Sequence, residues 1–190
     1  MFMLYSVFLG LAIALLAGGR VTRLGQVPIR WGGLAIAGLA IQLVLFSDPV
    51  TAVIGDAGPP IYVASTAAVL AVVIRNLRLV GLPIVAIGAA SNLIAILANG
   101  GYMPASPDAL AGASFTIGTG YSNSVEGGSV ALAPLTDIFA MPAWLPATNV
   151  FSIGDVLIGI GIVIAIVAAT RNPRFDPPPT QASVPHARPS

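Results

Sequence analysis

The basic residues of this chain, all of them arginines, are confined to three short segments that separate long apolar runs. They are Arg20, Arg23 and Arg30 in the first segment, Arg75 and Arg78 in the second, and Arg171, Arg174 and Arg188 in the last. The connections between these segments carry only acidic charges, at Asp48, Asp56, Asp108, Glu126 and Asp137. Short basic loops stay on the cytoplasmic side of a membrane, because moving Lys or Arg across the bilayer is disfavoured. The pattern therefore predicts five spans, with the N-terminus outside and the C-terminus inside.

Composition agrees with an all-α, polytopic helix bundle in the inner (plasma) membrane. Only 8% of the residues are charged and 56% are hydrophobic, whereas about a quarter of the residues of a soluble domain are charged. The net charge of +1 does not indicate nucleic acid, because the arginines flank the apolar runs. With no cysteine and a single histidine in a Pro-rich tail, the sequence favours neither a metal site nor a cysteine or Ser-His nucleophile, and we expect no cofactor.

The five apolar runs have the character of membrane helices. They occupy residues 2–19, 31–46, 61–74, 79–98 and 153–169. Each is near the roughly 20 residues that cross about 30 Å of hydrocarbon, although the second and third are short. The first run is predicted to be a retained span instead of a signal peptide, because its positive charges follow the apolar stretch instead of preceding it. We therefore predict a membrane domain over 1–170 and a disordered cytoplasmic tail over 171–190.

Small residues recur about one helical turn apart inside these runs. The set comprises Ala64 and Ala68, Ala67 and Ala71, Ala86 and Ala90, and Gly154, Gly159 and Gly161. Small side chains let helix backbones approach closely in lipid, where packing drives association. The spacing predicts a tightly packed bundle, and a dimerisation motif is the alternative.

The long connection at residues 99–151 is predicted to lie on the outer face. Residues 106–112 read as a short helix, because Ser106 can cap it, a proline occupies its first position and Gly112 ends it. Residues 113–129 are rich in Gly, Ser and Thr and are predicted to be mobile. The stretch 140–146 contains two prolines and Trp144, which suits the outer headgroup layer.

Several polar residues lie near the outer ends of the apolar runs. They are Gln42, Ser65, Thr66, Asn92, Asn99, Ser152 and Asp155. Polar side chains are costly inside lipid, and a shared depth on several helices suggests one polar pocket open to the outside. Hydrogen bonding between helices is the competing explanation. Asp155 can also have a structural role at the start of a helix, because Ser152-Ile-Gly-Asp155 before an apolar run is a capping-box pattern.

The chain as a whole resembles a family of small multi-pass bacterial membrane proteins carried as a domain of unknown function. The matching motifs are Arg75-Asn-Leu-Arg78, Asn92, Asn99-Gly-Gly-Tyr-Met-Pro104 and Asn149-Val-Phe-Ser-Ile-Gly-Asp155-Val-Leu, within residues 10–170. The resemblance implies a membrane fold and brings no activity with it.

Three shorter motifs are similar to those of the lipoprotein signal peptidases, which are membrane aspartyl proteases. The motifs are Ile87-Gly-Ala-Ala-Ser-Asn92-Leu-Ile, Leu135-Thr-Asp137-Ile-Phe and Phe151-Ser-Ile-Gly-Asp155. The resemblance implies a catalytic dyad of Asp137 and Asp155, with one carboxyl protonated, and an Asn92 that orients one of them. This chain departs from the family where Ala95-Ile96 replaces Asp-Arg and Ser152 replaces Asn, and it has an extra first span.

Two function classes follow from these features. The first is non-catalytic binding or scaffolding at the outer face, with membrane lipids or a membrane protein as partner. The second is an aspartyl hydrolase that uses Asp137 and Asp155. A transporter is a third possibility, weakened because no span carries a charge near its midplane.

Overall fold

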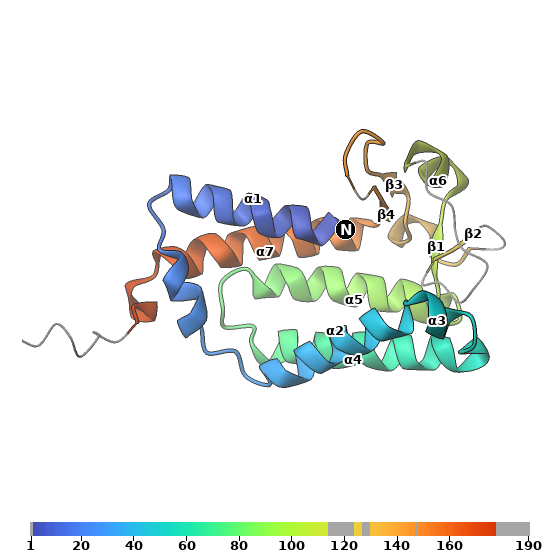
Figure 1. Ribbon diagram of the computed structural model, residues 1–190, viewed down its shortest axis with the longest axis horizontal. Coiled ribbons are helices and arrows are strands. Elements are labelled where there is room, and N and C mark those ends of the chain that lie inside the picture. The colour runs from blue at the N-terminus through green and yellow to red at the C-terminus, as the bar shows by residue number, and fades with distance from the viewer. Residues whose placement is uncertain (1, 114–123, 127–129, 147, 178–190) are drawn as a thin grey trace, which may run out of the picture.

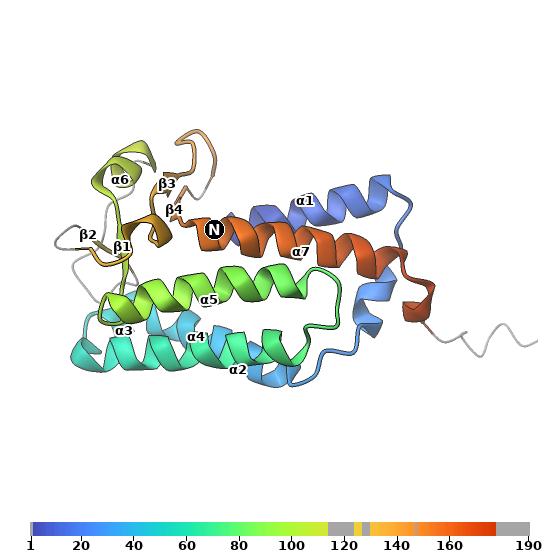
Figure 2. The same cartoon turned by 180° about the vertical axis from the view of Figure 1, so that it is seen from behind.

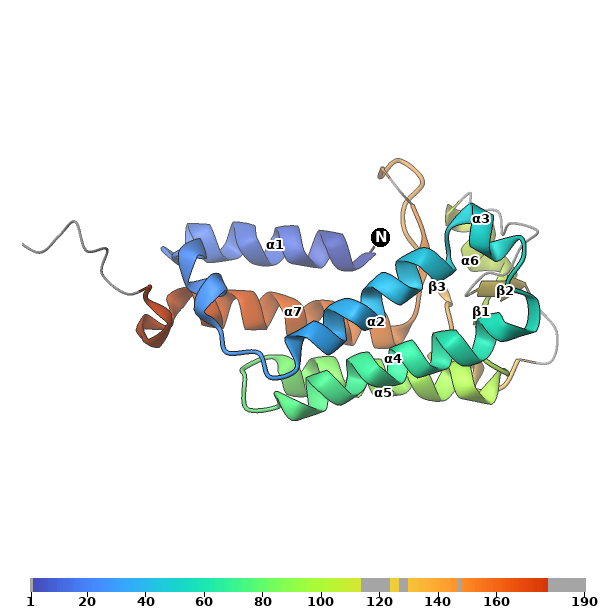
Figure 3. The same cartoon turned by 60° about the horizontal axis from the view of Figure 1, so that its bottom comes forward.

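Five long helices lie side by side in the computed structural model, which describes residues 2–113, 124–126, 130–146 and 148–177 (Figure 1). They are α1 (Phe2–Leu16), α2 (Gly32–Leu45), α4 (Gly58–Arg75), α5 (Leu82–Ala98) and α7 (Ile153–Arg171). The main contacts join α1 to α7, α7 to α5, α5 to α4 and α4 to α2. Figures 2 and 3 show the same arrangement, with α7 between α1 and α5 and with α2 against α4. The helix α7 therefore packs between two neighbours, α1 and α5.

Each long helix falls in one of the predicted apolar runs, with ends that differ by a few residues. The helix α1 ends at Leu16, ahead of Gly18, which adopts a positive φ of 74°. The helix α4 begins at Gly58, ahead of the predicted start, and includes Pro59 and Pro60 in its first turn. Proline is tolerated there because the first N–H groups of a helix need no partner within it.

Two helical stretches, Gly55–Arg75 and Ile153–Arg171, are long and apolar enough to cross a membrane. Three others, Phe2–Leu16, Gly32–Leu45 and Leu82–Ala98, are apolar but shorter. The number of spans and the orientation of the termini therefore remain predictions.

Glycines set the distance between α7 and its neighbours on both sides. A Cβ atom added at Gly161 would lie 2.8 Å from the carbonyl oxygen of Gly81, ahead of α5, and one added at Gly159 would lie 2.5 Å from Ser6 Oγ on α1. A Cβ atom on Gly88 of α5 would meet the carbonyl oxygen of Gly154. Real Cβ atoms do not come this close to other heavy atoms, so backbone packing at these positions requires glycine.

Apolar side chains cover much of the bundle's surface. Leu16 on α1 is 90% exposed, Leu43 on α2 is 79% exposed and Phe8 on α1 is 66% exposed. Single exposed leucines are ordinary, but a continuous apolar surface on a soluble protein is not. The five apolar helices therefore bury only part of their side chains against one another.

The charged end of the bundle, called here the arginine end, holds the turn after α1 and the segment after α7 (Figure 1). These are the 3₁₀ helices η1 (Val21–Gln26) and η4 (Pro173–Phe175). Arg23 donates from Nε to Asp176 at 2.8 Å and from Nη2 at 3.0 Å, and Arg20 lies 3.3 Å from the same carboxylate. The guanidinium of Arg23 lowers the pKa of Asp176.

The tail was predicted to be disordered from residue 171, and this is wrong for residues 171–177. The helix α7 continues to Arg171, Asn172 caps η4, and Asp176 is held by Arg23. The cause is a pairing between distant parts of the chain, which composition does not reveal. The rest of the tail, 178–190, lies outside the described residues.

The opposite end of the bundle is covered by the described residues of the segment 99–151, called here the cap segment. Its elements are β1 (Met103–Ala105), α6 (Pro107–Ala113), β2 (Ser124–Glu126), η3 (Ala133–Leu135), β3 (Phe139–Ala140) and β4 (Val150–Phe151), and the short α3 (Asp48–Thr51) and η2 (Gly55–Ala57) lie at the same end. Strand β1 pairs in parallel with β2, and β3 pairs antiparallel with β4. The predicted short helix is confirmed as α6, with Ser106 Oγ accepting from the Ala109 amide at 3.1 Å. The predicted mobile stretch falls largely on residues 114–123 and 127–129, outside the described residues.

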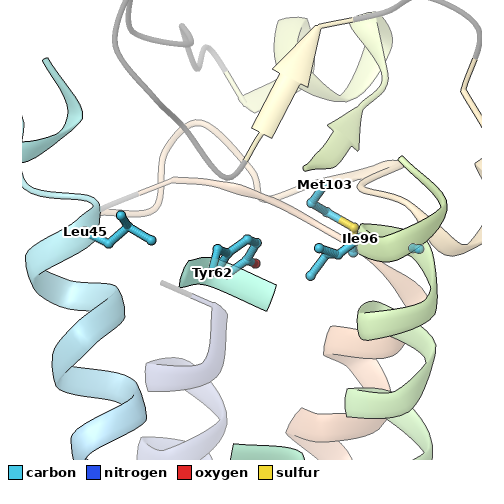
Figure 4. Close-up of a cluster of buried hydrophobic side chains, with 5 residues drawn as sticks. Leu45, Tyr62, Ile96 and Met103 are labelled. Atoms are coloured by element: carbon cyan, nitrogen blue, oxygen red, sulfur yellow. The ribbon is translucent and has the colours of Figure 1, made fainter. Parts of the chain in front are cut away.

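Two small apolar clusters connect the cap segment to the helices and to itself. Figure 4 shows the first, which consists of Leu45, Tyr62, Ala95, Ile96 and Met103. The second consists of Ala105, Ala109, Leu110, Ala113 and Val150. Because the first contains residues of α2, α4, α5 and β1, it fixes the cap segment on the ends of three helices.

Candidate functional site

The first turn of α7 carries the predicted capping box. Ser152 is fully buried, and its Oγ accepts from the Asp155 amide at 3.0 Å. The Asp155 carboxylate reaches back and accepts from the Ser152 amide at 3.0 Å. Two amides of the helix start are therefore satisfied, and the carboxylate lies at the positive end of the helix dipole. The predicted structural role of Asp155 is confirmed.

Asn92 joins the capping box from the neighbouring helix α5. Its Nδ2 donates to Asp155 Oδ1 at 2.8 Å, and its Oδ1 accepts from Ser152 Oγ at 2.8 Å. The glycine pair Gly88 and Gly154 brings α5 close enough to α7 for these bonds, and Gly154 lies directly beside the Asn92 amide. The three polar side chains form a closed hydrogen-bonded group, called here the Asn92 group (Asn92, Ser152 and Asp155). The predicted contact between Asn92 and one carboxylate is present.

Asp137 is held near this group by the backbone of the cap segment. Its amide donates to the Pro104 carbonyl at 3.0 Å, and its carbonyl accepts from the Ser106 amide at 3.0 Å. The residue is only 6% exposed. Its carboxyl group makes no hydrogen bond with any residue that the structure describes.

Burial raises the pKa of Asp137 to about 8, and the negative charge of Asp155 contributes in the same direction. A carboxyl group in poorly solvated surroundings favours its neutral form, and a nearby anion strengthens that preference. At neutral pH Asp137 is therefore mostly protonated.

The other predicted pocket residues lie in separate hydrogen-bonded pairs. Gln42 on α2 donates to Ser65 Oγ and to Thr66 Oγ1 on α4, both at 3.2 Å. Asn99 exchanges two hydrogen bonds with the backbone of Ala131, each at 2.9 Å. In the described part of the chain, no hydrogen bond links these pairs to the Asn92 group. A single shared pocket stays a prediction, and bonding between helices accounts for the contacts of Gln42 and Ser65.

Two polar residues that sequence reasoning did not single out tie distant segments together. Asn76 follows α4, and its side chain accepts from the Arg30 amide and donates to the Arg30 carbonyl, both at 2.8 Å. Tyr5 on α1 donates to the Pro146 carbonyl of the cap segment at 2.7 Å. The signal available in the sequence was an amide side chain between two arginines, in the motif Arg75-Asn-Leu-Arg78. The structure shows that this amide is buried.

The donor set of the site does not favour a metal ion. Among the residues that the structure describes, no three His, Cys, Asp or Glu side chains come together. The site offers two carboxyl groups, one amide and one hydroxyl, and most of these atoms already bond one another.

Comparison with known proteins identifies the family of the chain, and it does not identify a function. No curated protein and no solved structure matches it. One family model matches residues 26–167, from the turn after α1 to most of α7, and includes Asn92, Asp137, Ser152 and Asp155. The chain belongs to this family, which is described as a family of unknown function (DUF5317).

Proposed function

We propose that this chain is a multi-pass inner-membrane protein with five spans, an outside N-terminus and a cytoplasmic C-terminus. The exposed apolar side chains of the helices support this, because lipid would cover them. The segregation of charge supports the orientation. The turns that carry the described arginines lie at one end of the bundle, and the sequence of the cap segment at the other end has carboxyl groups and no arginine.

The function that the geometry supports best is non-catalytic binding or scaffolding at the outer face. The observation that carries it is the exposure of large apolar side chains on the cap segment, where Trp144 is 81% exposed. Leu132, Ile138 and Phe139 are exposed as well. Tryptophan beside prolines suits the boundary between headgroups and hydrocarbon. In the Asn92 group, in contrast, the polar atoms hydrogen-bond one another and hold α5 and α7 together. The partners are membrane lipids or a membrane protein at that boundary, and not nucleic acid.

The depth of Trp144 tests this proposal. The chain has two tryptophans, so the Trp31→Phe variant reports on Trp144 alone and Trp144→Phe reports on Trp31 alone. We expect lipids brominated near the headgroup to quench the fluorescence of Trp144 more strongly than lipids brominated near the chain ends. Trp144 emission that responds to aqueous iodide and to no brominated lipid would contradict a cap segment that rests on the membrane.

One observation favours a second candidate, an aspartyl hydrolase. Asp137 is buried, has no hydrogen-bond partner among the described residues and lies within the field of Asp155. In such a pair the charged carboxylate takes a proton from water, and the neutral carboxyl donates a proton to the carbonyl oxygen of the amide under attack. The three motifs similar to lipoprotein signal peptidases make a membrane-embedded signal peptide the substrate to try.

A hydrolase requires both carboxyl groups. In vesicles with a synthetic signal peptide, we expect Asp137→Asn and Asp155→Asn each to lower the cleavage rate at least about a thousandfold, as loss of an essential acid–base group does. Asp56→Asn, which changes an exposed carboxyl at the same end of the bundle, is the matched control. Absence of cleavage by the unmodified protein, or cleavage that survives either substitution, would leave the non-catalytic role.

A further inference from the structure

A shallow apolar groove lies along α7 at the arginine end of the bundle. Its volume is about 550 Å³, and it is lined by Val163, Ile164, Val167, Ala168 and Arg171. Residues three, four and eight apart on a helix share one face, so these side chains form a single stripe. The four apolar members are half-buried, unlike the protruding leucines of α1 and α2. The groove is therefore recessed into the bundle surface and ends at a guanidinium.

Among the described arginines, Arg171 is the one that lines the groove, and like Arg30, Arg78 and Arg174 it forms no ion pair. Arg23 and Arg20 share the single negative charge of Asp176, and the guanidinium of Arg75 lies over the Trp31 ring at 5.8 Å. Arg171 is exposed and forms no ion pair with any residue in the described part of the chain. Its positive charge is therefore available to an external anion that approaches along the groove.

The dimensions of the groove match one leaflet of a bilayer. From Val163 to Arg171 the helix rises about 12 Å, at about 1.5 Å per residue. Half of a hydrocarbon core of about 30 Å is about 15 Å. An apolar wall of this length that ends in a cation is complementary to an acyl chain whose headgroup carries a negative charge. On the proposed orientation the groove lies in the cytoplasmic leaflet, where basic sites attract anionic lipids.

We propose that this groove binds one anionic phospholipid, with its phosphate on Arg171 and one acyl chain along Val163, Ile164, Val167 and Ala168. The guanidinium presents paired N–H donors that match phosphate oxygens. The apolar stripe supplies the remaining contact, which a free phosphate ion cannot use. The site is independent of the cap segment and rests on the proposed membrane location and orientation.

Native mass spectrometry of the detergent-solubilised full chain tests the site, with phosphatidylglycerol, phosphatidylcholine and inorganic phosphate as probes. We expect phosphatidylglycerol to bind more tightly than phosphatidylcholine. Arg171→Gln should weaken phosphatidylglycerol binding roughly fivefold or more. Ala168→Trp, which fills the groove and keeps the charge, should weaken it as well. The matched controls are Arg78→Gln, an exposed arginine of the α4–α5 turn, and Leu43→Trp on the exposed face of α2.

Three results would overturn the proposal. Equal losses for Arg78→Gln and Arg171→Gln would show a diffuse attraction to positive charge. Equal binding of phosphatidylcholine would remove the role of the anion. If inorganic phosphate binds as tightly as phosphatidylglycerol, and if its binding survives Ala168→Trp, Arg171 is a site for a free anion and not for a lipid. Because the measurement uses neither a bilayer nor Trp144, its failure would leave the proposal for the cap segment intact.

Discussion

Replacing Gly88 with leucine should abolish or severely reduce the yield of folded protein. A Cβ atom at this position would meet the Gly154 carbonyl and would lie 2.9 Å from the amide nitrogen of Ile158. The helix α7 has no room to retreat, because Gly159 packs against Ser6 of α1 on its other side. Overpacking a close contact costs about 1–3 kcal/mol or more, and separating α5 from α7 would also break the bonds of the Asn92 group.

The measurement is the thermal midpoint and the monodisperse yield in detergent, with Gly33→Leu as the control. Gly33 lies in α2 with no heavy atom within 4 Å of an added Cβ. Leucine favours helix by about 0.8 kcal/mol over glycine, so the control should be neutral or slightly stabilised. If Gly88→Leu and Gly33→Leu behave alike, the contact between Gly88 and Gly154 does not set the packing of α5 on α7.

Replacing Asp137 with asparagine should stabilise the protein at alkaline pH and remove a pH dependence. The pKa of Asp137 is raised from 3.8 to about 8 in the folded chain, by burial first and by Asp155 second. Between these two values the folded chain binds more protons than the unfolded chain, so its stability falls as pH rises. Each pH unit within this window lowers the free energy of unfolding by up to about 1.4 kcal/mol. Asparagine keeps the shape of the protonated carboxyl and has no proton to lose.

Thermal midpoints in detergent between pH 5 and pH 9 check this expectation. The unmodified protein should lose stability steadily toward pH 8, whereas Asp137→Asn should show a flatter profile and a higher midpoint at the alkaline end. The control Asp56→Asn changes an exposed carboxyl and should keep the slope of the unmodified protein. A slope that survives Asp137→Asn would place the titrating group elsewhere and would weaken the case for a catalytic pair as well.

The features that could be predicted from the sequence are those with a local cause. A helix start is encoded in a few consecutive residues, so Ser106 and Ser152 both cap the helices they were expected to cap. The five apolar runs become five helices because an apolar stretch between turn residues has few other structures available. The contact of Asn92 with Asp155 came from a resemblance between motifs, and physical reasoning from this chain alone would not have found it.

The features that could not be predicted depend on which distant segments meet. Asp176 looked like part of a disordered tail, since nothing near it in the sequence indicates that Arg23 will pair with it. Asn76 contacts Arg30 across 46 positions of the chain. The grouping of the polar residues did not follow from their depth, because residues at one depth can face different neighbouring helices. Gln42 on α2 bonds α4, whereas Asn92 on α5 bonds α7.

The place of α7 between α1 and α5 has a consequence for how the protein is made. A ribosome delivers α1 first and α7 last, yet α1 packs mainly on α7. During synthesis, α2, α4 and α5 can assemble with one another as they emerge, whereas Ser6 and Gly10 must wait for the final helix. The helix α1 therefore packs on its main neighbour only once α7 has been made, and a chain interrupted before residue 153 leaves it without that neighbour.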